Sequence, residues 1–144
     1  MSEAQGGSTK KCILAVDDTA VILTRISEIL CNDYEVVTAN SGARAMKFLK
    51  ERKPDLILLD IKMSPMDGIQ TLQEIRSSKD LEDIPVIMLT GVEDKDTVME
   101  SAKLGICDYI LKPFSSSELD KRIYRAFEKE RQKRLEEEKR AEEG

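Results

Sequence analysis

LILLDIKMSPMDG, at residues 56–68, is the stretch that decides the fold. Its first four residues are apolar without interruption, which is typical of a strand covered on both faces by other elements. An acid, Asp60, follows this run directly. The residues after it include several that favour turns, namely Ser64, Pro65, Asp67 and Gly68. The stretch therefore predicts a buried strand that ends at a carboxylate and leads into a turn.

Four further apolar runs lie on either side of this stretch: CILAV (12–16), YEVVTA (34–39), PVIML (85–89) and DYIL (108–111). The segments between the runs have apolar residues three and four positions apart, as amphipathic helices do. The last of these helices is expected to start near Ser116. Alternating strands and helices predict an α/β protein with a parallel sheet.

The order of the strands follows from their expected burial. The runs at 12–16, 56–59 and 85–89 are apolar throughout and belong in the centre of the sheet, whereas the runs at 34–39 and 108–111 contain polar residues and belong at its edges. This predicts a flavodoxin-like, doubly wound (βα)5 fold with a five-stranded parallel sheet of order 2-1-3-4-5. The first and third strands are then neighbours, and their carboxyl ends form the switch point where ligands bind in such sheets.

Composition limits the classes of function. The chain has 144 residues, a length that suits one domain, and a net charge of −5, which argues against a general nucleic-acid or membrane-surface binder. Histidine is absent, which excludes serine–histidine triads and histidine metal sites. There is no hydrophobic signal region and no apolar stretch of about 18 residues. We therefore expect no membrane partner and a cytoplasmic location.

Three segments follow from the change of pattern along the chain. Residues 1–10 are small and polar and predict a flexible leader, and residues 11–127 form the folded domain. Residues 128–144 are almost all charged, which indicates a helical extension or a linker. A coiled coil is the less favoured interpretation of this tail, because only Leu135 and Ala141 offer apolar contacts.

The three cysteines, Cys12, Cys31 and Cys107, are widely spaced and odd in number. Apolar residues surround them in the sequence, so we expect buried, reduced thiols with no redox or zinc role.

Polar residues follow the predicted strands at the edge that forms the switch point. They are Asp17 and Asp18 after the first strand, Asp60 after the third, Thr90 after the fourth and Lys112 after the fifth. Three acids a few ångströms apart repel one another unless a cation neutralises them, and an all-oxygen cluster selects a hard ion such as Mg²⁺. The pattern therefore predicts a Mg²⁺ site.

Each of these residues also has a simpler interpretation. Asp18 before a helix is ordinarily a helix cap, Thr90 the end of a strand and Lys112 a solvated charge. It is improbable that five such residues would fall at one edge of a sheet by coincidence. A functional site is therefore the favoured interpretation.

With these motifs in place, the chain from about Lys11 to Phe127 resembles the receiver domain of two-component response regulators, of the chemotaxis-regulator kind. The resemblance is carried by ILAVDD, LILLDIKMSPMDG, PVIMLTG and DYILKPF. It implies that Asp60 is the phosphoryl acceptor. It also implies that Asp18 and Asp60 bind Mg²⁺, with help from Asp17 through water and from the backbone carbonyl of Lys62.

The same resemblance assigns roles on the phosphoryl side of the site. Lys112 and Thr90 are expected to contact the phosphoryl oxygens, and Gly91 leaves room beside the acceptor. Tyr109 is the strand aromatic that reorients as Thr90 moves, although an ordinary edge-strand aromatic is the simpler interpretation. The surface of the fourth helix, fifth strand and fifth helix is then expected to change.

The implied function is a phosphorylation-dependent switch. A histidine kinase or a histidine phosphotransfer protein donates phosphate, and the altered surface controls an output protein or domain, with a homodimer through that surface as an option. We expect no enzyme activity beyond self-phosphorylation and self-dephosphorylation.

Two alternatives are less favoured. A haloacid-dehalogenase-like phosphatase places its two aspartates two residues apart after one strand, whereas Asp17 and Asp18 are adjacent. A degenerate receiver that only binds partners would have lost an acid or the lysine, and this chain keeps them.

Two features depart from the family's common pattern. Pro65 stands one place later than usual, with Ser64 in the common proline position, and Lys62 lies two residues after the acceptor. The shape of this loop and the lifetime of the phosphate are therefore left open.

Overall fold

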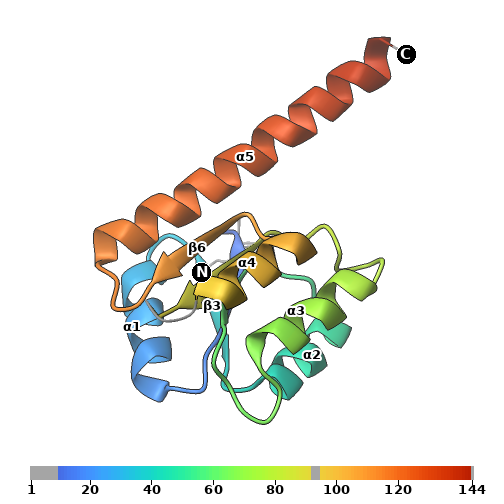
Figure 1. Ribbon diagram of the computed structural model, residues 1–144. Helices are drawn as coiled ribbons and strands as arrows, with labels where there is room; N and C mark the ends of the chain where they lie inside the picture. The colour runs from blue at the N-terminus through green and yellow to red at the C-terminus, as the bar shows by residue number, and fades with distance from the viewer. Residues whose placement is uncertain (1–9, 92–94, 144) are drawn as a thin grey trace.

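The computed structural model describes residues 10–91 and 95–143 (Figure 1). Of the predicted leader, residues 1–9 lie outside the described part. The strands are β2 (Cys12–Val16), β3 (Glu35–Ala39), β4 (Leu56–Asp60), β5 (Val86–Thr90) and β6 (Asp108–Leu111). The helices are α1 (Ala20–Leu30), α2 (Gly42–Glu51), α3 (Gly68–Ser77), α4 (Lys95–Leu104) and α5 (Ser116–Glu143).

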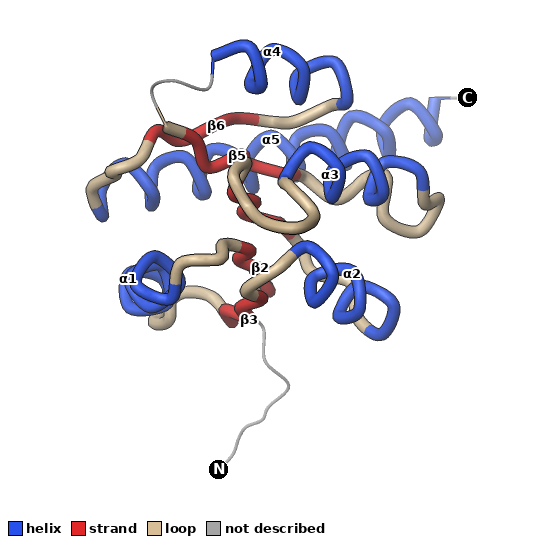
Figure 2. The backbone as a smooth tube through the Cα atoms, turned by 60° about the horizontal axis from the view of Figure 1, so that its bottom comes forward, coloured by secondary structure: helices blue, strands red, loops and turns tan. Residues whose placement is uncertain are grey.

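The strands form one parallel sheet in the order β3-β2-β4-β5-β6 (Figure 2). In order along the chain this is 2-1-3-4-5, so the predicted fold is confirmed. Strands β2, β4 and β5, which are apolar apart from Asp60 and Thr90 at the ends of β4 and β5, are fully buried, and the two partly polar strands lie at the edges. The strands that are buried on both faces therefore take the central positions in the sheet.

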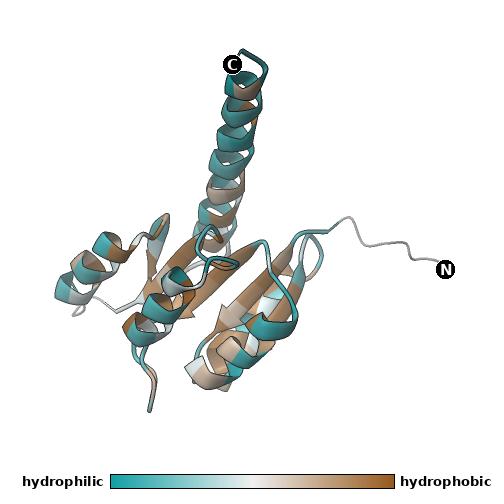
Figure 3. Cartoon of the chain, turned by 90° about the vertical axis from the view of Figure 1, so that its right-hand side faces the viewer, coloured by the Kyte–Doolittle hydropathy of each residue, from teal (hydrophilic) through white to brown (hydrophobic). Residues whose placement is uncertain are grey.

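Helices cover both faces of the sheet. Leu14 and Val16 of β2 face a core cluster that includes residues of α2, α3 and α4, whereas Ile13 and Ala15 face a second cluster with residues of α1 and α5. This alternation follows the two-residue period of a strand. Figure 3 shows the result as an apolar sheet between helices whose outer surfaces are hydrophilic.

Helix α5 continues far past its last buried residue, Ala126, and ends at Glu143 (Figure 1). Residues 131–143 are exposed on every side. Among the described residues, no helix is both long and apolar enough to cross a membrane.

One expectation about the cysteines is wrong. Cys12 is buried and Cys107 is partly buried, but Cys31 is exposed. Cys31 caps the carboxyl end of α1, where its backbone N–H bonds to the Ser27 carbonyl, so it lies beyond the last residue that α1 buries. None of the three forms a disulfide within the described chain.

Candidate functional site

The three acids meet at the carboxyl edge of the sheet. Asp17 and Asp18 follow β2, and Asp60 is the last residue of its neighbour β4. One carboxylate oxygen from each residue lies within 4.8 Å of the others. The structure therefore brings together the acids that the topology predicts to converge.

The acids differ in their surroundings. Asp17 is completely buried, and its Oδ1 accepts a hydrogen bond of 2.9 Å from the backbone N–H of Thr19. Asp18 is exposed, and the residue at the N-cap position of α1 is Thr19, which makes no side-chain cap bond. The simpler interpretation of Asp18 as a helix cap is therefore wrong. Its carboxylate is turned to solvent beside two buried ones, where an ion can reach it.

Lys112 bridges the two buried acids. Its Nζ donates to Asp17 Oδ2 at 2.7 Å and to Asp60 Oδ1 at 2.9 Å. Its backbone N–H donates to the carbonyl of Thr90 at 2.7 Å, which ties the end of β6 to the end of β5. The lysine thus supplies positive charge between two carboxylates that otherwise repel each other.

Burial and hydrogen bonds shift the pKa values of Asp60 and Lys112. Burial raises the pKa of Asp60 from 3.8 to about 6, and the charge of Asp17 adds to the rise, against the opposing hydrogen bond from Lys112. For Lys112, burial acts to lower the pKa, but the hydrogen bonds to Asp17 and Asp60 outweigh it and raise the pKa of the ammonium. Lys112 is therefore charged at neutral pH, and Asp60 is mostly ionised.

The loop after Asp60 is held by close backbone packing. The Gly68 N–H donates to the Ile61 carbonyl at 2.8 Å, and a Cβ at position 68 would lie 2.2 Å from the Asp60 carbonyl oxygen. Asp67 caps α3 through a capping box with Gln70. The loop that contains Lys62 is therefore closed by α3 against the end of β4.

The remaining predicted residues lie around this centre. Thr90 is buried at the end of β5, and its hydroxyl donates to the Gly91 carbonyl at 3.1 Å. Lys62 is exposed in the β4–α3 loop. Tyr109 lies on edge strand β6 with 45% of its surface exposed, outside the acidic cluster.

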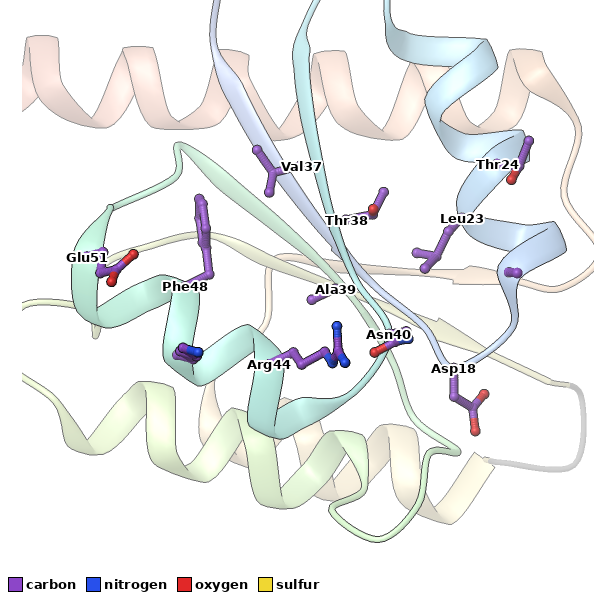
Figure 4. Close-up of a pocket in the computed structure, with 12 residues that line it drawn as sticks. Asp18, Leu23, Thr24, Val37, Thr38, Ala39, Asn40, Arg44, Phe48 and Glu51 are labelled. Atoms are coloured by element: carbon purple, nitrogen blue, oxygen red, sulfur yellow. The ribbon is translucent and has the colours of Figure 1, made fainter.

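A hollow of about 780 Å³ adjoins Asp18 (Figure 4). Asp18 lies at its rim, and its walls come from α1, edge strand β3 and α2. Leu23 and Phe48 supply apolar surface, and the side chain of Arg44 extends from α2 toward Asn40. The hollow therefore leads from solvent to the exposed acid of the cluster.

One contact near the site was not anticipated from the sequence. Arg25 of α1 donates to the backbone carbonyl of Phe114, two residues after Lys112. An isolated arginine on an amphipathic helix gives no signal that separates it from a solvated charge, because its acceptor is a backbone atom 89 residues away.

Comparisons with known proteins agree with the fold. A family model described as the response regulator receiver domain matches residues 13–124. The chain is 41% identical over 119 residues to the probable transcriptional regulator ycf27 of Guillardia theta, covering 80% of this chain and 44% of that protein. It is 37% identical over 114 residues to the alkaline phosphatase synthesis transcriptional regulatory protein PhoP of Bacillus subtilis, covering 78% of this chain and 47% of that protein. The chain thus spans less than half the length of these relatives.

Among solved structures, the chemotaxis response regulator CheY4 of Vibrio cholerae matches with a TM-score of 0.78 and 29% identity, over 82% of this chain and 99% of that one. This chain belongs to the response regulator receiver domain family. It is therefore a receiver domain of two-component signal transduction with a flavodoxin-like fold.

Proposed function

We propose that Asp60 accepts a phosphoryl group from a phosphohistidine of a histidine kinase or a histidine phosphotransfer protein. The observation that carries the proposal is Lys112 bound to both Asp17 and Asp60, with Asp18 completing a cluster of carboxylates within 4.8 Å. A nucleophilic carboxylate, two further acids and an ammonium are the groups that phosphoryl transfer to an aspartate needs.

The donor set fits Mg²⁺, because it offers only oxygen ligands and includes one exposed acid that an ion can reach from solvent. Asp18, Asp60 and the backbone carbonyl of Lys62 would hold the ion directly, with Asp17 acting through water. When bound, Mg²⁺ neutralises charge on the acceptor and on the transferred oxygens.

The chain's own residues account for the transfer. Lys112 Nζ donates to Asp60 Oδ1 at 2.9 Å and so lies beside the acceptor carboxylate. A carboxylate oxygen of Asp60 forms a new bond to phosphorus as the phosphorus–nitrogen bond of the donor breaks. The electron pair stays on the imidazole nitrogen, which takes up a proton from water. Lys112 and Thr90 then contact the phosphoryl oxygens, and Gly91 leaves room for them.

The new group carries nearly two negative charges and offers Thr90 and Lys112 a stronger partner than they have before transfer. Lys112 is then drawn from Asp17 and Asp60 toward the phosphoryl group, and Thr90 breaks its bond to the Gly91 carbonyl. Because the backbones of Thr90 and Lys112 are hydrogen-bonded, β5 and β6 move together. Tyr109 reorients, and the face of α4, β6 and α5 changes.

The altered face controls an output protein or domain, or pairs with a second copy in a homodimer. It carries exposed apolar residues from α4 and β6, namely Met99, Tyr109 and Leu111. The named relatives are transcriptional regulators about twice as long as the matched region. We infer a signalling role in the cytoplasm, with any output on DNA exerted by another domain or protein.

Acetyl phosphate tests the proposal directly. Wild-type protein incubated with Mg²⁺ and acetyl phosphate is expected to gain one phosphoryl group by intact-mass spectrometry, and Asp60→Asn none. Asp33→Asn, an exposed acid outside the cluster, is the matched control and is expected to label like the wild type. Equal labelling of Asp60→Asn, or an unmodified wild type, would remove the acceptor assignment.

A further inference from the structure

We propose that Arg25 is a positioning residue that holds Lys112 at the acidic cluster by clamping the loop between β6 and α5 to α1. The inference rests on the proposed function, because Lys112 is the group through which Arg25 acts.

Arg25 makes two contacts with one residue of this loop. Its Nη2 donates to the backbone carbonyl of Phe114 at 2.8 Å, and the guanidinium lies over the Phe114 ring, 5.6 Å from the centroid. The Phe114 ring is 7% exposed and packs into the core between α1 and α5. Arg25 is itself exposed, so each contact alone contributes modestly, but both contacts act on the same residue, Phe114.

Phe114 lies close enough to Lys112 in the chain for Arg25 to fix the position of the lysine. At the start of the loop, the Lys112 N–H bonds to the Thr90 carbonyl, and at its end Ser115 Oγ accepts from the Glu118 N–H at 3.0 Å. Between these anchors, the Phe114 carbonyl is bound by Arg25. Phe114 is two residues from Lys112, so a shift of its backbone displaces the root of the lysine side chain.

The clamp also joins the two sides of the site. Helix α1 follows Asp17 and Asp18 within a few residues, and the β6–α5 loop passes beside it (Figure 1). Arg25 therefore fixes the element that follows the acids to the loop that carries the lysine. The bonds from Lys112 to Asp17 and Asp60, at 2.7 and 2.9 Å, depend on that spacing. A small misplacement of a charged group at a reacting centre has a large effect on rate.

Removal of the clamp is tested with Arg25→Met, which keeps the aliphatic stem and loses the donor. With Mg²⁺ present, the maximal rate of phosphorylation by acetyl phosphate is expected to fall about three- to tenfold, while the Mg²⁺ dissociation constant stays within about twofold. Arg25→Lys, which keeps a cation able to reach the carbonyl, is expected to recover part of the rate. Arg125→Met, the same change at an exposed arginine of α5, is the control and is expected to leave the rate unchanged.

A double-mutant cycle shows whether Arg25 acts through Lys112. In a Lys112→Ala background, Arg25→Met is expected to cause no further slowing, measured by mass spectrometry over long incubations. Equal slowing in both backgrounds, or an Arg25→Met rate equal to the wild type, would overturn the inference. Arg25→Gln serves as a second variant if the melting temperature of Arg25→Met is lowered. A wild type that does not label refutes the proposed function instead, so the two failures are distinguishable.

Discussion

Asp60 is 4% exposed, and within the described residues Lys112 donates to its carboxylate while two acids lie beside it. Burial raises its pKa to about 6, so the metal-free folded state holds its proton more tightly than the unfolded chain does. At neutral pH the ionised carboxylate therefore destabilises the fold, which is common for functional residues.

The first prediction concerns this destabilisation. Without metal at pH 8, Asp60→Asn is expected to raise the free energy of unfolding by about 1–3 kcal/mol, because the amide carries no buried charge. The folded-state pKa of Asp60 is raised, so the folded state favours the protonated carboxyl. The stability that this protonation contributes is fully present below about pH 4 and is lost as pH rises through about 6. Urea unfolding in a chelator at pH 5 and at pH 8 measures the difference.

Mg²⁺ supplies the control for that measurement. Millimolar Mg²⁺ is expected to raise the melting temperature of the wild type and to have a smaller effect on Asp60→Asn, which loses the negative charge of a proposed ligand. An Asp60→Asn protein that is less stable than the wild type at pH 8 in chelator would contradict the electrostatic account.

At the scale of elements, the β4–α3 loop depends on one glycine. Gly68→Ala places a Cβ against the backbone of Asp60, where no flexible side chain can yield. We expect a loss of about 2–3 kcal/mol in the free energy of unfolding and slower labelling by acetyl phosphate. Urea unfolding and intact-mass spectrometry measure the two effects.

Gly105→Ala is the matched control for this change. Gly105 has φ +99°, a conformation that favours glycine, and it follows α4 outside the acidic cluster. The substitution is expected to cost about 1–2 kcal/mol of stability without slowing labelling of the folded protein. If both variants label at the wild-type rate, the packing of Gly68 has no part in shaping the site.

At the scale of the whole molecule, phosphorylation is expected to alter the face of α4, β6 and α5. Hydrogen exchange in β6 and the first turns of α5 should change when Asp60 is phosphorylated, and Thr90→Ala should reduce this change because the hydroxyl that follows the phosphoryl group is missing. Thr71→Ala removes another buried hydroxyl, one that bonds to the Asp67 carbonyl, and is expected to preserve the response. A full response in Thr90→Ala would exclude Thr90 as the switch.

The strand order could be predicted from the sequence, because apolar runs indicate central strands and partly polar runs indicate edge strands. The meeting of Asp17, Asp18 and Asp60 could be predicted because neighbouring parallel strands end at the same edge of a sheet. It did not reveal that Lys112 bridges two acids, since this depends on the reach of a flexible side chain. The exposure of Cys31 was missed because its apolar neighbours lie on the other side of α1. The Arg25 clamp ends on a backbone atom, which no residue type marks.

The length of α5 would enlarge any tilt of the helix at its start. Its 28 residues span about 42 Å at a rise of 1.5 Å per residue. A tilt of about 5° at the start of α5 would move its far end by about 4 Å. That start, Ser116, follows Lys112 by four residues, and α5 packs beside β6, so a displacement of the loop that carries Lys112 would be carried along the helix to Glu143.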